Sequence, residues 1–306
     1  MTQTIQIRKR APLPPWFRVT LPAGERLTVY QGTYAAVHAN QLHTVCEEAH
    51  CPNIHDCWAR GTATFMIAGQ TCTRSCHFCT VEHRRAPPPL DADEPRNLAE
   101  AIAGMGLTYA VITVVNRDDL PDGGAAHYRA CLEAAHARLP DLGLELLCSD
   151  LDGNEKALAG LLDGAPLCVF AHNVETVERL TPNVRDRKAS FRKSLRILAA
   201  AKELRPELMT KSSLMVGLGE TDADVTGAMK ALRSAKVDLL TLGQYLAPSA
   251  SHFPVMSYPT PEQFAGWKQE ALALGFLAVA SGPLVRSSFR AGQLYREALE
   301  LKKTSV

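Results

Sequence analysis

The stretch ATFMIAGQTCTRSCHFC, residues 63–79, decides the fold. It opens with an apolar run that is typical of a buried strand, and a glycine ends that run. Three cysteines follow at Cys72, Cys76 and Cys79, so they lie in the loop after the strand. Parallel barrels place their chemistry in the loops that follow the strands. The stretch therefore predicts a reactive loop at the first strand of a parallel sheet.

The rest of the chain repeats this order of strand and then helix. Further strand-like runs lie at 109–115, 144–148, 167–172, 210–217 and 238–244, with a short one at 276–280. Segments between them carry apolar residues at helical spacing. The clearest set is Tyr128, Cys131, Leu132, Ala135 and Leu139. This alternation indicates an α/β fold, and six such units predict a partial (β/α)6 TIM-like barrel. A doubly wound open sheet is the alternative that periodicity leaves open.

The two ends of the chain differ from this repeating middle. Residues 1–62 are polar and rich in Pro and His, without the strand–helix rhythm. We expect three parts: an N-terminal extension at 1–62, a barrel at 63–280, and a C-terminal extension at 281–306. A barrel of this length commonly forms a single domain.

Composition excludes several classes of partner. The 306 residues carry a net charge of +1, so no basic field attracts nucleic acid. The longest apolar run, residues 271–280, is about half of a membrane span, so we expect no membrane partner. The N-terminus shows no signal peptide, and we expect a cytoplasmic protein. Basic residues before the first acid resemble an organelle transit peptide, but Pro12, Pro14 and Pro15 would interrupt its amphipathic helix.

Cysteines crowd into one region. Six of the nine fall within residues 46–79, at Cys46, Cys51 and Cys57 and again in the later loop. Disulfides fit poorly, because they belong mainly to small secreted proteins and this cysteine total is odd. Zinc would need a fourth ligand, which His77 or His83 would have to supply. Three thiols on one loop suit an iron–sulfur cubane whose fourth iron stays open to a ligand.

The spacing C-x3-C-x2-C after a first strand resembles the radical S-adenosylmethionine (SAM) superfamily. The resemblance implies that the open iron binds the amino and carboxylate groups of SAM. It also implies that one electron from the cluster releases a 5′-deoxyadenosyl radical. The residue before the last cysteine is usually aromatic in that superfamily, and here it is Phe78.

A closer resemblance covers nearly the whole chain. The string HTVCEEAHCPN (43–53), with the later Cys57-Trp58, is similar to the lipoyl synthase family when CTRSCHFC follows it. RDDLPDGGA (117–125), AHNVETV (171–177), MVGLGE (215–220), GQYLAPS (243–249) and GPLVRSSFRAG (282–292) occur in the family's order. Biotin synthase shares the second cysteine group but lacks the first.

The resemblance implies two [4Fe–4S] clusters. Cys72, Cys76 and Cys79 would bind the SAM-binding cluster. Cys46, Cys51 and Cys57 would bind an auxiliary cluster, with a serine of an Arg-Ser-Ser-Tyr motif as its fourth ligand. Here that motif reads Arg286, Ser287, Ser288 and Phe289. We expect Ser288 as the ligand and Ser287 as the alternative. The Phe289 side chain lacks the family's tyrosine hydroxyl, so any hydrogen bond from that group is lost.

Residues that contact SAM follow from the same resemblance. Asp122, Gly123 and Gly124 resemble the superfamily's glycine-rich region near the amino group of the cofactor, although a tight turn before a helix would also explain them. Asn173 and Glu175 follow a strand and either contact the cofactor or cap the next helix. Lys211 is equally ambiguous.

The implied reaction is sulfur insertion. The radical would remove hydrogen from C6 and then C8 of an octanoyl chain on a carrier lysine, and the auxiliary cluster would give up sulfur. Implied partners are an octanoylated lipoyl domain of a 2-oxoacid dehydrogenase complex or the glycine cleavage H protein, a low-potential donor such as ferredoxin or flavodoxin, and an iron–sulfur carrier protein. Another radical SAM sulfur-inserting enzyme and a non-catalytic iron–sulfur carrier are the alternatives.

Overall fold

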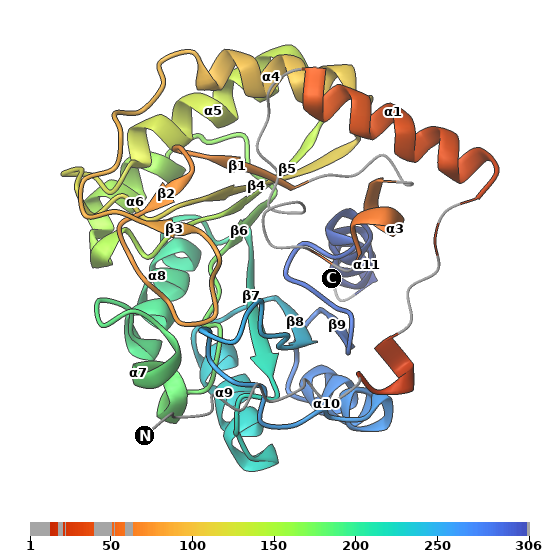
Figure 1. Ribbon diagram of the computed structural model, residues 1–306. Coiled ribbons are helices and arrows are strands. Elements are labelled where there is room, and N and C mark those ends of the chain that lie inside the picture. Colours follow the sequence, from red (N-terminus) through yellow and green to blue (C-terminus); the bar gives the residue numbers. More distant parts are fainter. Residues whose placement is uncertain are drawn as a thin grey trace, which may run out of the picture.

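Seven parallel strands form one curved sheet, and their order across the sheet follows their order along the chain (Figure 1). They are β1 (Thr64–Ile67), β4 (Tyr109–Val114), β5 (Gly143–Leu147), β6 (Val169–Ala171), β7 (Met209–Val216), β8 (Leu239–Gln244) and β9 (Ala278–Gly282). A doubly wound sheet would reverse its strand order part-way, and this sheet does not. The predicted partial barrel is therefore confirmed, with β1 and β9 as its two edges.

The computed structural model describes residues 13–17, 21, 23–39, 51, 53–58 and 64–304. Within these ranges, each strand from β1 to β8 of the large sheet is followed by a helix on the outside of the sheet (Figure 1). These helices are α4 (Glu94–Gly104), α5 (Ala125–Arg138), α6 (Glu155–Leu162), α8 (Phe191–Leu204), α9 (Asp222–Ser234) and α10 (Pro261–Ala273). The six predicted strand–helix units are thus present, and β9 adds a seventh strand.

Shorter elements fill the loops. They are β2 (Thr71–Cys72), β3 (Glu82–His83), η2 (Leu151–Gly153), η3 (Glu178–Leu180) and α7 (Thr181–Val184). β2 and β3 pair in parallel as a separate two-stranded sheet. This pairing holds the start of the cysteine loop against the segment that follows it.

Side chains at the helix starts explain where the outer helices begin. Thr221 and Asp224 form a reciprocal capping box at α9, and Thr260 and Gln263 form another at α10. Such caps satisfy backbone N–H groups that the first helical turn leaves without partners. The apolar faces then bury against the sheet. In α5 the buried side chains include Tyr128, Cys131, Leu132 and Ala135, which is the face that the sequence predicts.

The amino ends of the strands are closed by the C-terminal helix α11 (Ala291–Thr304). Leu294 and Ala298 of this helix pack with one residue from the start of each of four strands, namely Val169, Met209, Leu239 and Ala278. Burying these apolar side chains removes them from water, which is the main stabilising term in such packing. The opposite, carboxyl ends of the strands are left for the functional site.

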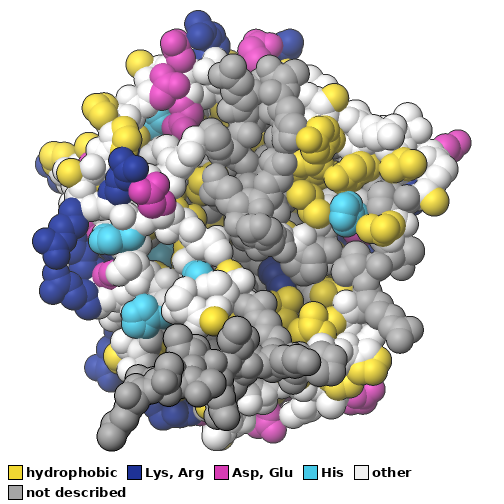
Figure 2. Space-filling view, in the orientation of Figure 1, with side chains coloured by type: hydrophobic (Ala, Val, Ile, Leu, Met, Phe, Trp, Pro, Cys, Tyr) yellow, Lys and Arg dark blue, Asp and Glu magenta, His cyan; other side chains and the backbone are white. Residues whose placement is uncertain are grey.

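The N-terminal part contributes η1 (Pro15–Phe17), α1 (Glu25–Ala39) and α3 (Ile54–Trp58). Trp58 is fully buried, whereas Leu27, Val29 and Tyr34 of α1 are exposed. Apolar side chains show over α1 in Figure 2. In the described part of the chain, helices that combine the length and apolar character needed to cross a bilayer do not occur. The predicted domain boundaries at 62 and 280 stay predictions, although β9 continues to Gly282.

Candidate active site

A cleft of about 570 Å³ lies at the carboxyl ends of the strands. Residues that end or follow β1, β4, β5, β6, β7 and β8 line it, together with segments from both ends of the chain. Among the residues predicted from sequence, those that line the cleft are Cys51, Cys72, Cys76, Phe78, Cys79, Asn173, Glu175, Ser287 and Ser288. The cleft therefore brings together residues that lie more than 200 positions apart in the sequence.

The loop from Cys72 to Cys79 presents all three of its thiols to this cleft. Backbone N–H groups point at the sulfur atoms, and that of Val81 faces Cys79. Cys72 Sγ accepts from Arg74 N and Asn116 N, each at 3.4 Å, and Cys76 Sγ accepts from Asp186 N at 3.3 Å. Such N–H groups stabilise negative charge on sulfur, so they suit thiolates that hold a cluster.

Two thiols of the loop, Cys76 and Cys79, hold their protons more tightly than an ordinary cysteine. Burial raises the pKa of Cys76 to about 11 and that of Cys79 to about 12, and the neighbouring Cys72 and Glu175 add to both shifts. Metal binding must therefore displace these protons. Three buried thiols around one cavity provide the soft donors that an iron–sulfur cluster needs, and the residues fit such a group.

The histidines considered as zinc ligands are engaged elsewhere or exposed. His77 Nδ1 lies 2.7 Å from the carbonyl of Asn183, and His83 is an exposed residue of β3. Within the described ranges, a compact group of three metal-ligating side chains occurs at Glu94, His127 and Cys131, and not in the cysteine loop. Thiols that share a cleft without converging on one point suit a polynuclear cluster better than a single ion.

The first cysteine group reaches the same cleft from outside the barrel. Cys51 lines the cleft, and Cys57 is a half-buried residue of α3, while Cys46 lies outside the described residues. Burial raises the pKa of Cys51, and the N–H of Asn53 and the charge of Arg286 oppose that shift. The guanidinium of Arg286 therefore lies near this thiol and favours its anionic, metal-binding form.

Two direct contacts dock this first segment onto the C-terminal segment. Asn53 Nδ2 donates to the carbonyl of Leu284 at 2.5 Å, and Arg290 lies 3.7 Å from Asp56. Ser287 and Ser288 also line the cleft that Cys51 lines. The structure thus brings Cys51 of the first cysteine group and both candidate serines to the same cleft.

The residues predicted to contact SAM separate into two groups. Asn173 and Glu175 line the cleft, and Glu175 has a left-handed backbone conformation with φ of +66°. Its N–H donates to Ser213 O at 3.1 Å, and its carbonyl accepts from Met215 N at 2.8 Å. Burial raises the pKa of Glu175, while Arg185 and Asn173 lower it. These bonds fix the Glu175 side chain at the cleft despite the unusual conformation.

The other predicted contacts lie away from the cleft lining. Asp122 accepts from Gly124 N and Ala126 N, each at 2.9 Å, so its carboxylate caps α5. Gly124 has φ of +91°, and a Cβ there would lie 2.7 Å from Tyr128 Oη. Gly123 borders a smaller hollow nearby. These facts fit the tight turn that the sequence also suggested.

Lys211 is buried in the barrel and does not line the cleft. Its side chain is 1% exposed, and Nζ lies 2.7 Å from Glu145 Oε1 on β5. Tyr109 Oη donates to the same carboxylate at 2.9 Å. A buried charge needs a partner of this kind, so the contacts explain Lys211 without a cofactor.

Comparisons with known proteins agree with this geometry. A family model described as the radical SAM superfamily matches residues 66–232. The chain is 53% identical over 282 residues to the lipoyl synthase of Anaeromyxobacter dehalogenans, covering 92% of this chain and 94% of that protein. It is 50% identical over 298 residues to the mitochondrial lipoyl synthase of Drosophila grimshawi, covering 96% of this chain and 80% of that one.

The chain belongs to the lipoyl synthase family.

Solved structures support the fold of this family member. The FeFe-hydrogenase maturase HydG from Carboxydothermus hydrogenoformans matches with a TM-score of 0.55 at 14% identity, covering 90% of this chain and 68% of that one. Methylornithine synthase (PylB) matches with a TM-score of 0.50 at 13% identity, covering 77% of this chain and 71% of that one. The identification of a radical SAM enzyme of the lipoyl synthase family is thus confirmed.

Several polar residues of the cleft escaped prediction from sequence, among them Arg74, Arg185, His172 and Ser149. Arg185 and His172 form a buried chain in which both contact the hydroxyl of Ser194, each at 2.8 Å. Ser194 belongs to helix α8, so no local spacing in the sequence reveals that it joins these two side chains. The sequence offers one hint of these contacts. A basic residue, Arg74, lies between two cysteines, and the acidic pair Asp118-Asp119 is available to balance its charge.

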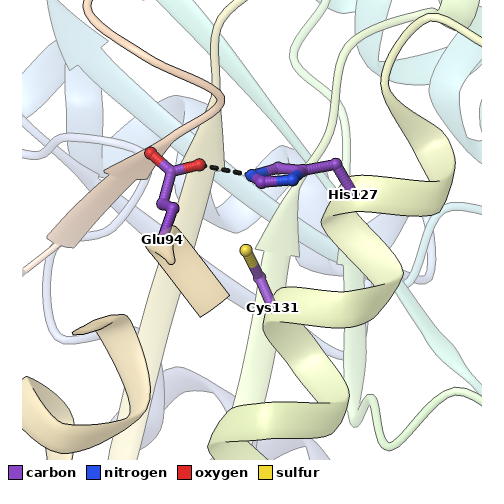
Figure 3. Close-up of side chains that lie close together, drawn as sticks. All are labelled: Glu94, His127 and Cys131. Atoms are coloured by element: carbon purple, nitrogen blue, oxygen red, sulfur yellow. Dashed lines mark hydrogen bonds and ion pairs between the residues drawn. The ribbon is translucent and has the colours of Figure 1, made fainter. Parts of the chain in front are cut away.

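The Glu94, His127 and Cys131 cluster lies outside the cleft, between α4 and α5 (Figure 3). Glu94 Oε2 accepts from Ala68 N at 2.8 Å and lies 2.5 Å from His127 Nε2. These partners already occupy that carboxylate oxygen. The cluster therefore braces the end of β1, from which the cysteine loop departs.

Proposed function

We propose that this chain inserts two sulfur atoms, at C6 and C8, into an octanoyl chain carried on a lysine of a lipoyl carrier protein. Membership of the lipoyl synthase family supports the proposal. The observation that carries it is that Cys51 and Ser288, from outside the barrel, line the same cleft as Cys72, Cys76 and Cys79. A carbon radical made beside one cysteine group then needs no diffusion to meet sulfur held by the other.

The same proposal assigns the metal ligands. Cys72, Cys76 and Cys79 hold a [4Fe–4S] cluster that binds SAM. Cys46, Cys51 and Cys57 hold an auxiliary [4Fe–4S] cluster with Ser288, or alternatively Ser287. When bound, these groups supply the 5′-deoxyadenosyl radical and the sulfur atoms. A serine oxygen is a harder donor than a thiolate and holds iron less well, which suits a cluster that is dismantled.

The chain itself binds and shields the substrate. Apolar side chains line part of the cleft, among them Met66, Val115, Leu147, Leu214 and Met215. An apolar wall suits an octanoyl chain and keeps water out of the cleft. The remaining wall carries Asn173 and Glu175, which we assign to SAM together with Phe78. Four other predicted residues do not contact SAM directly in this assignment, because they do not line the cleft: Asp122, Gly123, Gly124 and Lys211.

The partners follow from the substrate and from electron supply. They are an octanoylated lipoyl domain or glycine cleavage H protein, a low-potential donor such as ferredoxin or flavodoxin, and an iron–sulfur carrier that rebuilds the auxiliary cluster. A cytoplasmic location is part of the proposal. The matched relatives include proteins named mitochondrial, so this location stays a prediction.

The proposal predicts that the two cysteine groups fail in different ways. Replacing Cys46, Cys51 and Cys57 with Ala should leave release of 5′-deoxyadenosine from SAM but abolish sulfur insertion. Replacing Cys72, Cys76 and Cys79 with Ala should abolish both activities. Chromatography of 5′-deoxyadenosine and mass spectrometry of an octanoylated lysine peptide measure the two outcomes.

The matched control is Cys168→Ala, because that thiol lies outside the cleft, where it donates to the carbonyl of Leu144 at 3.0 Å. It should retain both activities. Sulfur insertion by the Cys46, Cys51 and Cys57 variant would refute the assignment of the sulfur source.

A further inference from the structure

The three residues between Cys72 and Cys76 are each held by an aspartate from another loop. Thr73 Oγ1 donates to Asp118 Oδ2 at 3.0 Å, and Asp118 N donates back to Thr73 Oγ1 at 3.0 Å. Ser75 N donates to Asp186 Oδ2 at 3.0 Å. Arg74, between them, is held by two carboxylates. The loop is thus tied to the segments that follow β4, β5 and α7.

Arg74 makes the most extensive of these connections. Its Nε and Nη2 donate to the two oxygens of Asp118 at 3.0 and 2.8 Å. Its Nη1 and Nη2 donate to the two oxygens of Asp150 at 2.7 and 2.6 Å. The guanidinium is 2% exposed, and Asp118 and Asp150 are 6% and 0% exposed. Planar, bidentate pairs of this kind impose geometry as well as neutralising charge.

The two aspartates come from different parts of the sheet. Asp118 follows β4, and Asp150 follows β5, so Arg74 joins the cysteine loop to two adjacent strand ends. The main-chain N–H of Arg74 also donates to Cys72 Sγ, and Asp186, which holds Ser75, donates its N–H to Cys76 Sγ. Movement of Arg74 would therefore disturb both the direction of the thiols and the N–H groups that face them.

We propose that Arg74 is a positioning residue, which holds the cysteine loop in its cluster-binding shape through Asp118 and Asp150. The inference rests on the proposed assignment of Cys72, Cys76 and Cys79 as cluster ligands. Holding the loop requires the forked shape of the guanidinium, and not only its positive charge. A lysine keeps the charge but cannot donate four hydrogen bonds to two carboxylates in one plane.

The test is Arg74→Lys in a chain whose Cys46, Cys51 and Cys57 are replaced by Ala, so that only one cluster contributes. After anaerobic reconstitution, iron per chain and the midpoint potential from an EPR-monitored titration are measured. Arg74→Lys should hold at least two-fold less iron. The cluster it retains should have a more negative potential, because N–H groups that stabilise the reduced state are displaced.

Arg117→Lys is the matched control. Its guanidinium is also 2% exposed and also pairs with an aspartate, Asp119, at 2.8 Å. Its other hydrogen bonds reach Ala68 O and Pro88 O, so none reaches the residues between Cys72 and Cys76. This control should hold parental iron at parental potential. Asp150→Asn is a milder companion, since it keeps the Asp118 pair, and should fall between Arg74→Lys and the parent.

The outcomes separate the two levels of the proposal. A parent chain that binds no iron would overturn the assignment of the cysteine loop itself. If the parent binds iron and Arg74→Lys has the same iron content and potential, only the positioning role is overturned. If Arg74→Lys fails to fold, the iron content and potential of Asp150→Asn decide, because unchanged values there refute the role of the Asp150 contact.

Discussion

At the scale of single residues, His172 shows how the cleft wall is kept neutral. Its Nδ1 lies 2.9 Å from the carbonyl of Cys148, and its Nε2 lies 2.8 Å from Ser194 Oγ. The carbonyl can only accept, so Nδ1 carries the proton and Nε2 accepts from the hydroxyl. Burial lowers the pKa of His172 to about 4, with Asp150 opposing the shift and Arg185 adding to it.

This lowered pKa predicts a pH-dependent stability. Below its ordinary pKa of 6.5, the unfolded chain binds a proton on His172 that the folded chain refuses until about pH 4. The free energy of unfolding therefore decreases as the pH is lowered through this window, by about 2 kcal/mol from pH 7 to pH 5. His172→Gln cannot titrate, so the thermal midpoint of this variant should fall less steeply over the same range. Equal slopes in both proteins would contradict the neutral, buried histidine.

Residue-scale prediction from sequence succeeds where spacing carries the information. Cys72, Cys76 and Cys79 could be found because three thiols on one short loop are rare outside metal sites. Arg74 and His172 could not, because their partners, Asp118 and Asp150 for Arg74 and Ser194 of α8 for His172, lie far from them in the sequence. Lys211 shows the opposite limit: a lysine on a strand looks like a candidate ligand until Glu145 is seen beside it.

At the scale of elements, the strand β8 supports the C-terminal segment that carries Ser288. Gly243 lies in β8, and a Cβ added there would overlap the backbone carbonyl of Val285. The close approach of the two backbones therefore requires glycine. Arg286 Nη1 also donates to the carbonyl of Gln244 at 3.3 Å, next to this contact. The strand thus sets the height of residues 285–288 over the cleft.

Gly243→Ala is expected to push this segment away from Cys51. Iron bound by the first cysteine group should be lost, so that iron per chain falls by roughly half, and overpacking should cost about 1–3 kcal/mol of stability. Iron analysis and thermal unfolding after anaerobic reconstitution measure both. Retention of all the iron would show that the backbone contact does not position the serine.

Three variants calibrate that result. Gly266→Ala lies in α10 with open space around it, so it should keep all the iron. Ser288→Ala removes the proposed oxygen ligand and should reproduce the iron loss without the loss of stability. Ser287→Ala should keep all the iron. If Ser287→Ala loses iron and Ser288→Ala keeps it, the ligand is Ser287.

Element-scale prediction from sequence was accurate for strands and incomplete for packing. The run at 210–217 became β7 (Met209–Val216), and the run at 238–244 became β8, because apolar runs between turn residues have few alternatives. The last helix of the fold is α11. Its place across the amino ends of the strands could not be predicted, since an amphipathic pattern shows that a face is buried but not against what.

At the scale of the whole molecule, segments outside the barrel cover both ends of the strands. α11 closes the amino ends of the strands, while residues 51–58 and 284–290 meet beside the cleft. The cleft wall is therefore complete only when segments more than 200 residues apart are both in place. The resemblance to a known family predicted this meeting through Ser288, whereas composition and periodicity did not.

The central claim is that this cleft converts an octanoyl chain into a lipoyl group. The most direct measurement is mass spectrometry of an octanoylated lysine peptide after anaerobic incubation with the reconstituted chain, SAM and a reductant. The account predicts a product that has gained two sulfur atoms, with 5′-deoxyadenosine released. Release of 5′-deoxyadenosine without any gain of sulfur by the peptide would contradict it.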